Sequence, residues 1–99
     1  MCSAAPLSSD FFFDRIEGAD DSMIEFAKNV ILLAFKEYPS PEKDWEKCVF
    51  VSNKFGEKYG GNWSISFIKN GDVCFWSKDY YIKLRYNDYK IKIGKIDLI

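Results

Sequence analysis

The sequence has no histidine, and this absence excludes several kinds of chemistry. Neither a Ser-His-Asp nor a Cys-His catalytic arrangement can form, and a zinc site with imidazole ligands cannot be built. The candidate nucleophiles Cys48, Cys74 and Ser77 have no base of suitable pKa close to them in the sequence. We therefore expect that the protein is not an enzyme.

Cysteines and long apolar runs are also scarce. The three cysteines, Cys2, Cys48 and Cys74, form no Cys-x-x-Cys motif, which argues against a disulfide framework and favours a reducing compartment. No apolar run approaches the roughly 20 residues that cross a bilayer, and residues 1–13 do not resemble a signal peptide. We expect a cytoplasmic protein without a membrane span.

The densest acidic group is Asp20-Asp21 with Glu25. It lacks the spaced oxygens and the glycine of a calcium-binding loop, so capping of a helix is the simpler role. We expect no metal and no other cofactor.

The composition fits one folded domain. The chain has 99 residues, of which 47% are apolar and 18% aromatic, and its formal net charge is −1. This length holds a single hydrophobic core, and a charge so close to zero argues against a dedicated nucleic-acid binder. We expect a flexible lead at residues 1–10 and one domain at residues 11–99.

The first half of that domain has the pattern of a short strand and two helices. Phe11-Phe12-Phe13 predicts a short edge strand or, as the less favoured alternative, an aromatic docking segment. Ser22 and Glu25 fit a capping box for a helix whose apolar residues lie three and four apart. A second helix begins after Ser40-Pro41 and ends at Gly60-Gly61. Its buried face is predicted to hold Trp45, Cys48, Val49, Ser52, Phe55 and Tyr59.

The second half changes to the alternation that is typical of strands. Residues 63–67, 81–86 and 89–93 alternate, whereas Val73-Cys74-Phe75-Trp76 is apolar at every position. Asn70-Gly71 is a strong turn signal. The fold class is predicted to be α+β, with two helices packed on an antiparallel sheet of four to five strands.

The apolar strand at residues 73–76 presents a physical problem. Two helices cover one side of such a sheet, and the chain has nothing left to cover the other side of this strand. An exposed patch of that kind promotes association. A second copy of the chain, a bound peptide or both would provide the missing cover.

The segment Lys54-Phe55-Gly56-Glu57-Lys58-Tyr59, followed by Trp63, resembles the dynein light chain family of the eight-kilodalton type, as a divergent member. Glu42-Lys43-Asp44 before the second helix also matches, as does the order of helix, helix and strands. The resemblance covers about residues 14–95, which is most of the chain.

The resemblance implies a non-enzymatic, strand-exchanged homodimer, in which the third strand of each copy pairs with the partner's sheet. Clients, among them the dynein intermediate chain, would add a short extended peptide motif to that strand in a groove at the interface. Two equal grooves would make the dimer a bivalent hub. The resemblance further implies a cytoplasmic, cytoskeleton-associated protein of microtubule motor complexes, without a nucleic-acid partner.

The resemblance also assigns site residues. The peptide groove would be formed by Lys43, Asp72, Cys74, Trp76, Ser77, Leu84 and Tyr86, and the dimer interface would contain Ser64, Val73 and Phe75. Ser77 and Ser64 stand where family members have histidines. The groove is therefore expected to be bulky and less polar, and the dimer should not dissociate through histidine protonation between about pH 5 and 7.

Three alternatives stay open. Asn70-Gly71, taken locally, predicts a tight hairpin that would favour a monomer or an altered dimer. The chain could instead be a diverged scaffold, or a tegument-type interaction module, without dynein binding. A single-stranded nucleic-acid binder would use a basic aromatic sheet face made of Lys83, Arg85, Lys90 and Lys92 with Tyr80, Tyr81 and Tyr89.

Overall fold

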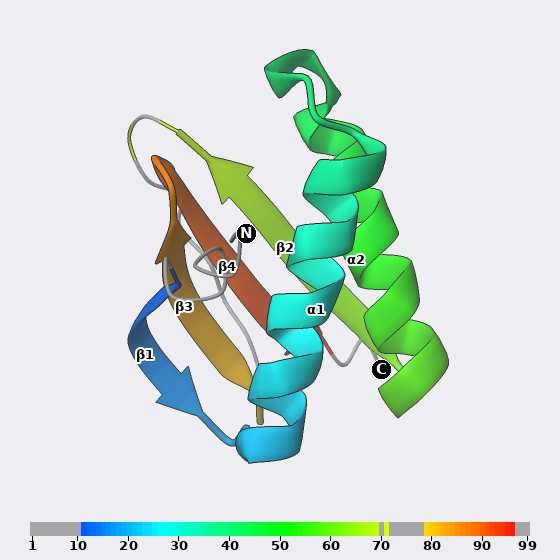
Figure 1. The fold of residues 1–99 in the computed structure, drawn as a ribbon. Helices are drawn as coiled ribbons and strands as arrows, with labels where there is room; N and C mark the ends of the chain where they lie inside the picture. The colour runs from blue at the N-terminus through cyan, green and yellow to red at the C-terminus, as the bar shows by residue number, and fades with distance from the viewer. Residues whose placement is uncertain (1–10, 70, 72–78, 97–99) are drawn as a thin grey trace, which may run out of the picture.

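The computed structural model describes residues 11–69, 71 and 79–96. These residues contain four strands and three helical segments. In chain order they are β1 (Phe12–Glu17), α1 (Asp21–Glu37), the 3-10 helix η2 (Pro41–Lys43), α2 (Asp44–Tyr59), β2 (Asn62–Ile68), β3 (Tyr81–Tyr86) and β4 (Tyr89–Ile96). The strands form one antiparallel sheet in the order β1-β3-β4-β2. Both long helices lie on the same side of it (Figure 1). The predicted fold class is confirmed.

The phenylalanine triplet leads into β1, the edge strand that it predicts. β1 pairs with β3 from Phe12↔Arg85 to Glu17↔Tyr81, and the register shifts between Phe13 and Arg15. Phe13 packs against the core from its margin, whereas Phe12 is 56% exposed. One face of the strand is therefore partly buried, as the alternation of a half-covered edge strand requires.

Helix α1 begins where the acidic pair supplies a cap. The Met23 N–H donates to Asp20 Oδ1 over 3.0 Å, so Asp20 is the N-cap residue. The predicted capping box at Ser22 is wrong, because α1 begins at Asp21 and Ser22 already lies in its first turn. The buried residues do follow the predicted spacing of three and four: Met23, Ala27, Val30, Ile31 and Ala34.

Helix α2 buries Phe55, as the sequence predicts, but its buried face is rotated from the predicted one. Its buried residues are Lys47, Val51 and Phe55, which repeat every fourth position. Trp45 is 74% exposed and Val49 39% exposed, so their assignment to the buried face is wrong. Trp45 and Val49 are each two positions from the buried Lys47, which is a rotation of about 200° around the helix axis. Both side chains therefore point away from the buried side of α2.

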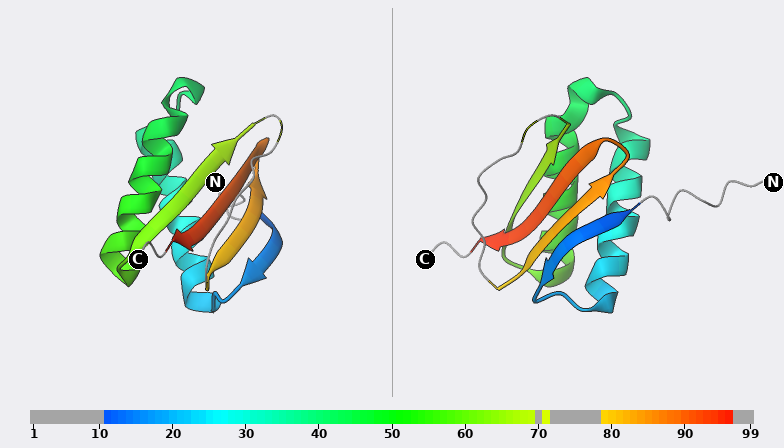
Figure 2. Two further views of the ribbon diagram at one scale, coloured as in Figure 1. Left: turned by 180° about the vertical axis from the view of Figure 1, so that it is seen from behind. Right: turned by 90° about the vertical axis from the view of Figure 1, so that its left-hand side faces the viewer.

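The core lies between the two helices and one face of the sheet. Alternate residues of the strands face the helices and are buried: Trp63, Phe67, Ile82, Leu84, Tyr86, Tyr89, Ile91 and Ile93. Phe35 of α1 sits over this layer, with ring centroids 5.2 Å from both Tyr86 and Tyr89. Figure 2 shows the sheet from its open side, with β1 and β2 at its two edges.

Some predictions fall outside the described residues. These are the flexible lead at residues 1–10, Asn70 of the predicted turn, and the apolar strand at residues 73–76. They stay predictions. Within the part of the chain that the structure describes, neither long helix has the length and apolar character to cross a bilayer.

Candidate functional site

The two edges of the sheet differ in how well they are protected against a further strand. β1 has a register shift and carries the charged residues Arg15 and Glu17, which are features that discourage edge pairing. β2 has no charged residue and no proline, and it pairs with β4 without a shift from Asn62↔Ile96 to Ile68↔Lys90. No strand among the described residues pairs with its other side. Within the part of the chain that the structure describes, the outer edge of β2 is therefore unpaired and has no protective feature.

A shallow apolar hollow lies beside this open edge. Its volume is about 280 Å³, and the residues that line it come from α2, β2 and the end of β4: Trp45, Cys48, Val49, Ser52, Asn53, Trp63, Ser64, Ile65 and Ile96. None of these side chains is acidic or basic. We name it the central hollow.

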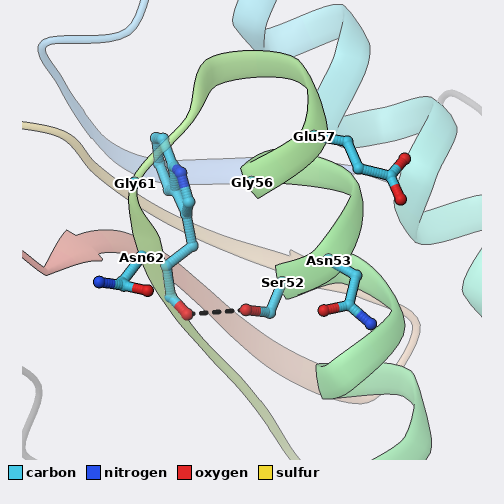
Figure 3. Close-up of a pocket in the computed structure, with 7 residues that line it drawn as sticks. Ser52, Asn53, Gly56, Glu57, Gly61 and Asn62 are labelled. Atoms are coloured by element: carbon cyan, nitrogen blue, oxygen red, sulfur yellow. Dashed lines mark hydrogen bonds between the residues drawn. The ribbon is translucent and has the colours of Figure 1, made fainter.

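A second hollow, the C-terminal hollow, lies at the end of α2 (Figure 3) and shares Ser52, Asn53 and Trp63 with the central one. Its volume is about 420 Å³, and it is lined by Ser52, Asn53, Gly56, Glu57, Gly61, Asn62 and Trp63. Ser52 Oγ donates to the Trp63 carbonyl oxygen over 2.9 Å, and Trp63 Nε1 donates to the Gly60 carbonyl oxygen over 2.9 Å. These two bonds hold β2 against α2 and fix the width of the depression between them.

A third hollow, the N-terminal hollow, lies on the other side of Trp45 and Val49. Its volume is about 300 Å³, and it is lined by Tyr38, Trp45, Glu46, Val49, Phe50 and Asn53. The central hollow shares lining residues with each of the other two. We call the three hollows together the α2 groove.

A buried polar network fixes the start of α2 at the end of this groove. The Lys47 side chain is fully buried, and its Nζ donates to Asp44 Oδ1 and to the Ser40 carbonyl oxygen, both over 2.8 Å. Tyr89 of β4 donates its hydroxyl to the same Asp44 oxygen over 2.8 Å. Burial, and then the hydrogen bond to the Asp44 carboxylate, raises the pKa of Tyr89 to about 12.

Cys48 lines the central hollow but has the properties of a structural residue. Desolvation is the main cause that raises the pKa of its thiol, and the neighbouring Asp44 carboxylate adds to this effect. The thiolate is the nucleophilic form of cysteine. A thiol with a raised pKa is therefore poorly suited to nucleophilic catalysis, in agreement with the expected packing role.

The structure brings one of the predicted site residues into the groove. Ser64 lines the central hollow, and Lys43 is exposed at the end of η2, outside the residues that line the three hollows. Leu84 is fully buried and Tyr86 is 5% exposed, both facing the helices, so in this chain neither is available to a peptide. The other predicted residues, Asp72, Val73, Cys74, Phe75, Trp76 and Ser77, lie outside the described residues.

The sequence pattern does not predict that Trp45 and Val49 are surface residues. Both are apolar and fit the periodic pattern of a helix, so the pattern places them on its buried face. The signal that could have corrected this is the series 47, 51 and 55, but it requires a lysine in the core. Lysine is almost never fully buried unless it is paired.

The basic aromatic face of the rival nucleic-acid interpretation is not assembled as predicted. Lys83 lies opposite Lys92 and Arg85 opposite Lys90 on neighbouring strands, and Lys92 is only 6% exposed. Tyr89 is buried on the helix side, and Tyr80 packs on the buried Trp63 with ring centroids 5.7 Å apart. Of the three predicted tyrosines, these two are therefore directed away from the basic side chains. Stacking of successive bases needs several aromatic rings on one face.

Comparisons with known proteins bear on the fold. No family model matches the chain, and no curated protein matches it. Two solved structures of the dynein light chain-like domain of calcium binding protein FhCaBP2 from Fasciola hepatica are similar to it. The native form has a TM-score of 0.78 at 12% identity and covers 88% of this chain and 91% of that one. The mercury derivative has a TM-score of 0.76 at 18% identity and covers 96% and 100%. The chain therefore has the dynein light chain-like fold: two helices packed on one face of a four-stranded antiparallel sheet.

Proposed function

We propose that the chain is a small, non-enzymatic adaptor domain that binds an extended polypeptide segment by adding it to the free edge of β2. The observation that carries this proposal is the contrast between the two edges of the sheet. β1 is irregular and charged, whereas β2 is regular, uncharged and bordered by the α2 groove. An edge without protective features is the part of a sheet that accepts another strand.

The mode of binding follows from the geometry of strands. The backbone of the added segment would form hydrogen bonds with β2, and these bonds would supply affinity that depends little on sequence. Alternate side chains of the segment would point towards the helix layer and enter the α2 groove. Trp45, Val49 and Ile65 would then contact those side chains and provide selectivity.

The same edge can take a strand from a second copy of the chain. The apolar residues 73–76 and the dynein light chain-like fold support a strand-exchanged homodimer, with client peptides bound beside the exchanged strand. In its most specific form the proposal is a cytoplasmic, cytoskeleton-associated light chain that binds the dynein intermediate chain or other clients through linear motifs.

A diverged adaptor without dynein binding is the second candidate. The observation that favours it concerns the residues assigned through the resemblance. Leu84 and Tyr86 are buried, and Lys43 lies outside the groove lining. Binding of a synthetic dynein intermediate chain peptide to the purified chain separates the two candidates, because only the first expects it.

The backbone of the bound peptide provides the main test. Peptides selected from a random library on the purified chain are resynthesised with N-methyl groups at one residue at a time. Strand addition predicts that every second methylation abolishes binding while the others are tolerated, because alternate N–H groups face the sheet edge. Hydrogen exchange should show new protection of β2 amides. Uniform tolerance of methylation, or protection of β1 amides in place of β2, would overturn the proposal.

A further inference from the structure

The N-terminal hollow has a composition that strand addition at β2 does not use. Of the six described residues that line it, three are aromatic, Tyr38, Trp45 and Phe50, one is acidic, Glu46, and none is basic. An aromatic ring presents the negative face of its quadrupole to a cation, and a nearby carboxylate adds to that attraction. This combination of side chains favours a cationic ligand.

The aromatic rings stand on two sides of one strip of α2. Trp45 and Phe50 are five positions apart, which is a rotation of about 140° around the helix axis. The strip between them carries Glu46, Val49 and Asn53. Tyr38, the first residue after α1, packs on Phe50 with ring centroids 6.3 Å apart. Tyr38 and Phe50 therefore form one wall of the hollow, and Trp45 forms the other.

The Trp45 ring and the Glu46 carboxylate are both free to contact a ligand. Trp45 is 74% exposed, and its ring stacks on no other ring within residues 11–69, 71 and 79–96. Across the same residues, Glu46 takes part in no salt bridge and no side-chain hydrogen bond. A ligand in this hollow would therefore neither displace a packed ring nor compete with an internal ion pair.

Phe50 already takes part in one contact of the kind that the hollow would offer. Lys54 Nζ lies 5.5 Å from the centroid of the Phe50 ring. Lys54 is not among the residues that line the hollow. The hollow thus provides a second place for a cation beside Phe50, and this one also has the Trp45 ring and a carboxylate.

We propose that the N-terminal hollow binds the methylated ammonium group of a lysine side chain in a partner polypeptide. The inference does not depend on strand addition, because none of the β2 residues lines this hollow. An unmodified lysine ammonium is compact and strongly hydrated, and the few polar groups of the hollow would replace little of that water. Aromatic cages are known to recognise methylated ammonium groups, including methyl-lysine.

The charge of Glu46 favours a lysine side chain over a lipid as the source of the group. The choline head of a phospholipid carries a phosphate close to its ammonium, and Glu46 would repel that phosphate. A lysine stem brings no anion. The volume of about 300 Å³ is at the lower end of the range for complete small-molecule ligands, roughly 300–1,000 Å³, and suits the end of one side chain.

The test compares three blocked peptides, Gly-Ser-X-Ser-Gly, that differ only in X. X is trimethyllysine, lysine, or a neutral analogue of trimethyllysine in which a tert-butyl group replaces the trimethylammonium group. The trimethyllysine peptide should bind roughly tenfold more tightly than either of the others. Equal binding of the neutral analogue would show an apolar contact alone, and equal binding of lysine would show a surface charge effect alone. Either result would overturn the inference.

Substitutions in the chain assign the binding to residues. Trp45→Ala should weaken binding of the trimethyllysine peptide by roughly tenfold, and Trp45→Phe, which keeps a ring, by less. Glu46→Gln should weaken it by roughly threefold. Leu33→Ala, an exposed apolar residue of α1, and Glu57→Gln, an exposed carboxylate of α2, are the matched controls and should change nothing. Unchanged binding in Trp45→Ala would contradict the proposal.

Phosphatidylcholine vesicles test the other source of the group. The chain should not sediment with such vesicles. Sedimentation that is lost in Trp45→Ala, together with no binding of the trimethyllysine peptide, would assign the hollow to lipid and reject the proposed partner.

Hydrogen exchange separates this inference from the proposed function. The bound trimethyllysine peptide should leave the exchange of β2 amides unchanged, because it occupies the outer side of α2. New protection of β2 amides would show that the peptide binds at the sheet edge, and the inference would then be wrong. Failure of the trimethyllysine peptide to bind would also reject the inference, while strand addition at β2 would keep its own test.

Discussion

Tyr89 in β4 donates its hydroxyl to the Oδ1 atom of Asp44, over 2.8 Å, although the two residues are 45 positions apart in the sequence. The same oxygen accepts from the buried Lys47 ammonium. One carboxylate thus joins the last strand to the first turn of α2. A buried charge with a good partner is tolerated, but the loss of that partner is costly.

Removal of this carboxylate should destabilise the fold more than removal of the hydroxyl. Asp44→Ala removes the carboxylate from the buried Lys47 ammonium, which keeps the Ser40 carbonyl oxygen and the faces of the Phe35 and Tyr89 rings, and we expect a loss of about 3 kcal/mol in the free energy of unfolding. Tyr89→Phe leaves the ion pair intact and should cost about 1 kcal/mol. Urea unfolding at neutral pH measures both. Glu37→Ala is the exposed control, and an equal loss in that variant would show that the network does not stabilise the fold.

Alkaline pH should weaken the fold through Tyr89. Its pKa rises from 10 to about 12 in the folded chain, so the folded state holds the phenolic proton more tightly than the unfolded state. The associated stability is complete below pH 10 and is lost as the pH rises from 10 to about 12. Unfolding measured across this interval should depend on pH more steeply in the native chain than in Tyr89→Phe. Equal slopes would contradict the raised pKa.

The pattern of the sequence predicts the helices and most of the strands because periodicity reports which side of an element is covered. The series from Met23 to Ala34 is buried as expected. The face of α2 could not be predicted in this way, because it includes Lys47, whose charge is compensated by Asp44 and by the Ser40 carbonyl oxygen, three and seven residues before it. Trp45, which the periodic pattern places on the buried face, is 74% exposed.

The site is harder to predict from the sequence than the fold is. The groove depends on the sheet order β1-β3-β4-β2, which makes β2 an edge, and on the contact between Ser52 and the Trp63 carbonyl. Neither is encoded in a local motif. The resemblance assigned Leu84 and Tyr86 to a groove, although their alternation with Lys83 and Arg85 already predicts one covered face. Of the residues it named, Ser64 reaches the groove.

Two glycines with positive φ should respond very differently to alanine. Gly18, at φ +77°, faces the Asp79 carbonyl so closely that an added Cβ would overlap it, whereas Gly60, at φ +74°, has nothing near the same position. Gly60→Ala should cost about 1 kcal/mol for backbone conformation alone. Gly18→Ala should cost clearly more, since the turn between β1 and α1 must also move. Thermal unfolding of both variants measures the difference, and equal costs would show that this turn yields freely.

A lysine introduced on one edge strand or the other can show which edge of the sheet binds the peptide. Ser64→Lys places a lysine on β2 beside the central hollow, and Phe12→Lys places one on β1, where Phe12 is 56% exposed. A lysine on an edge strand opposes the addition of another strand. We expect Ser64→Lys to lower peptide affinity by roughly tenfold, which corresponds to 1.4 kcal/mol, and to reduce any self-association seen by sedimentation. Phe12→Lys should alter neither quantity. Weaker binding in Phe12→Lys with normal binding in Ser64→Lys would move the binding edge to β1, because the side chain that interferes must lie beside the strand that is added.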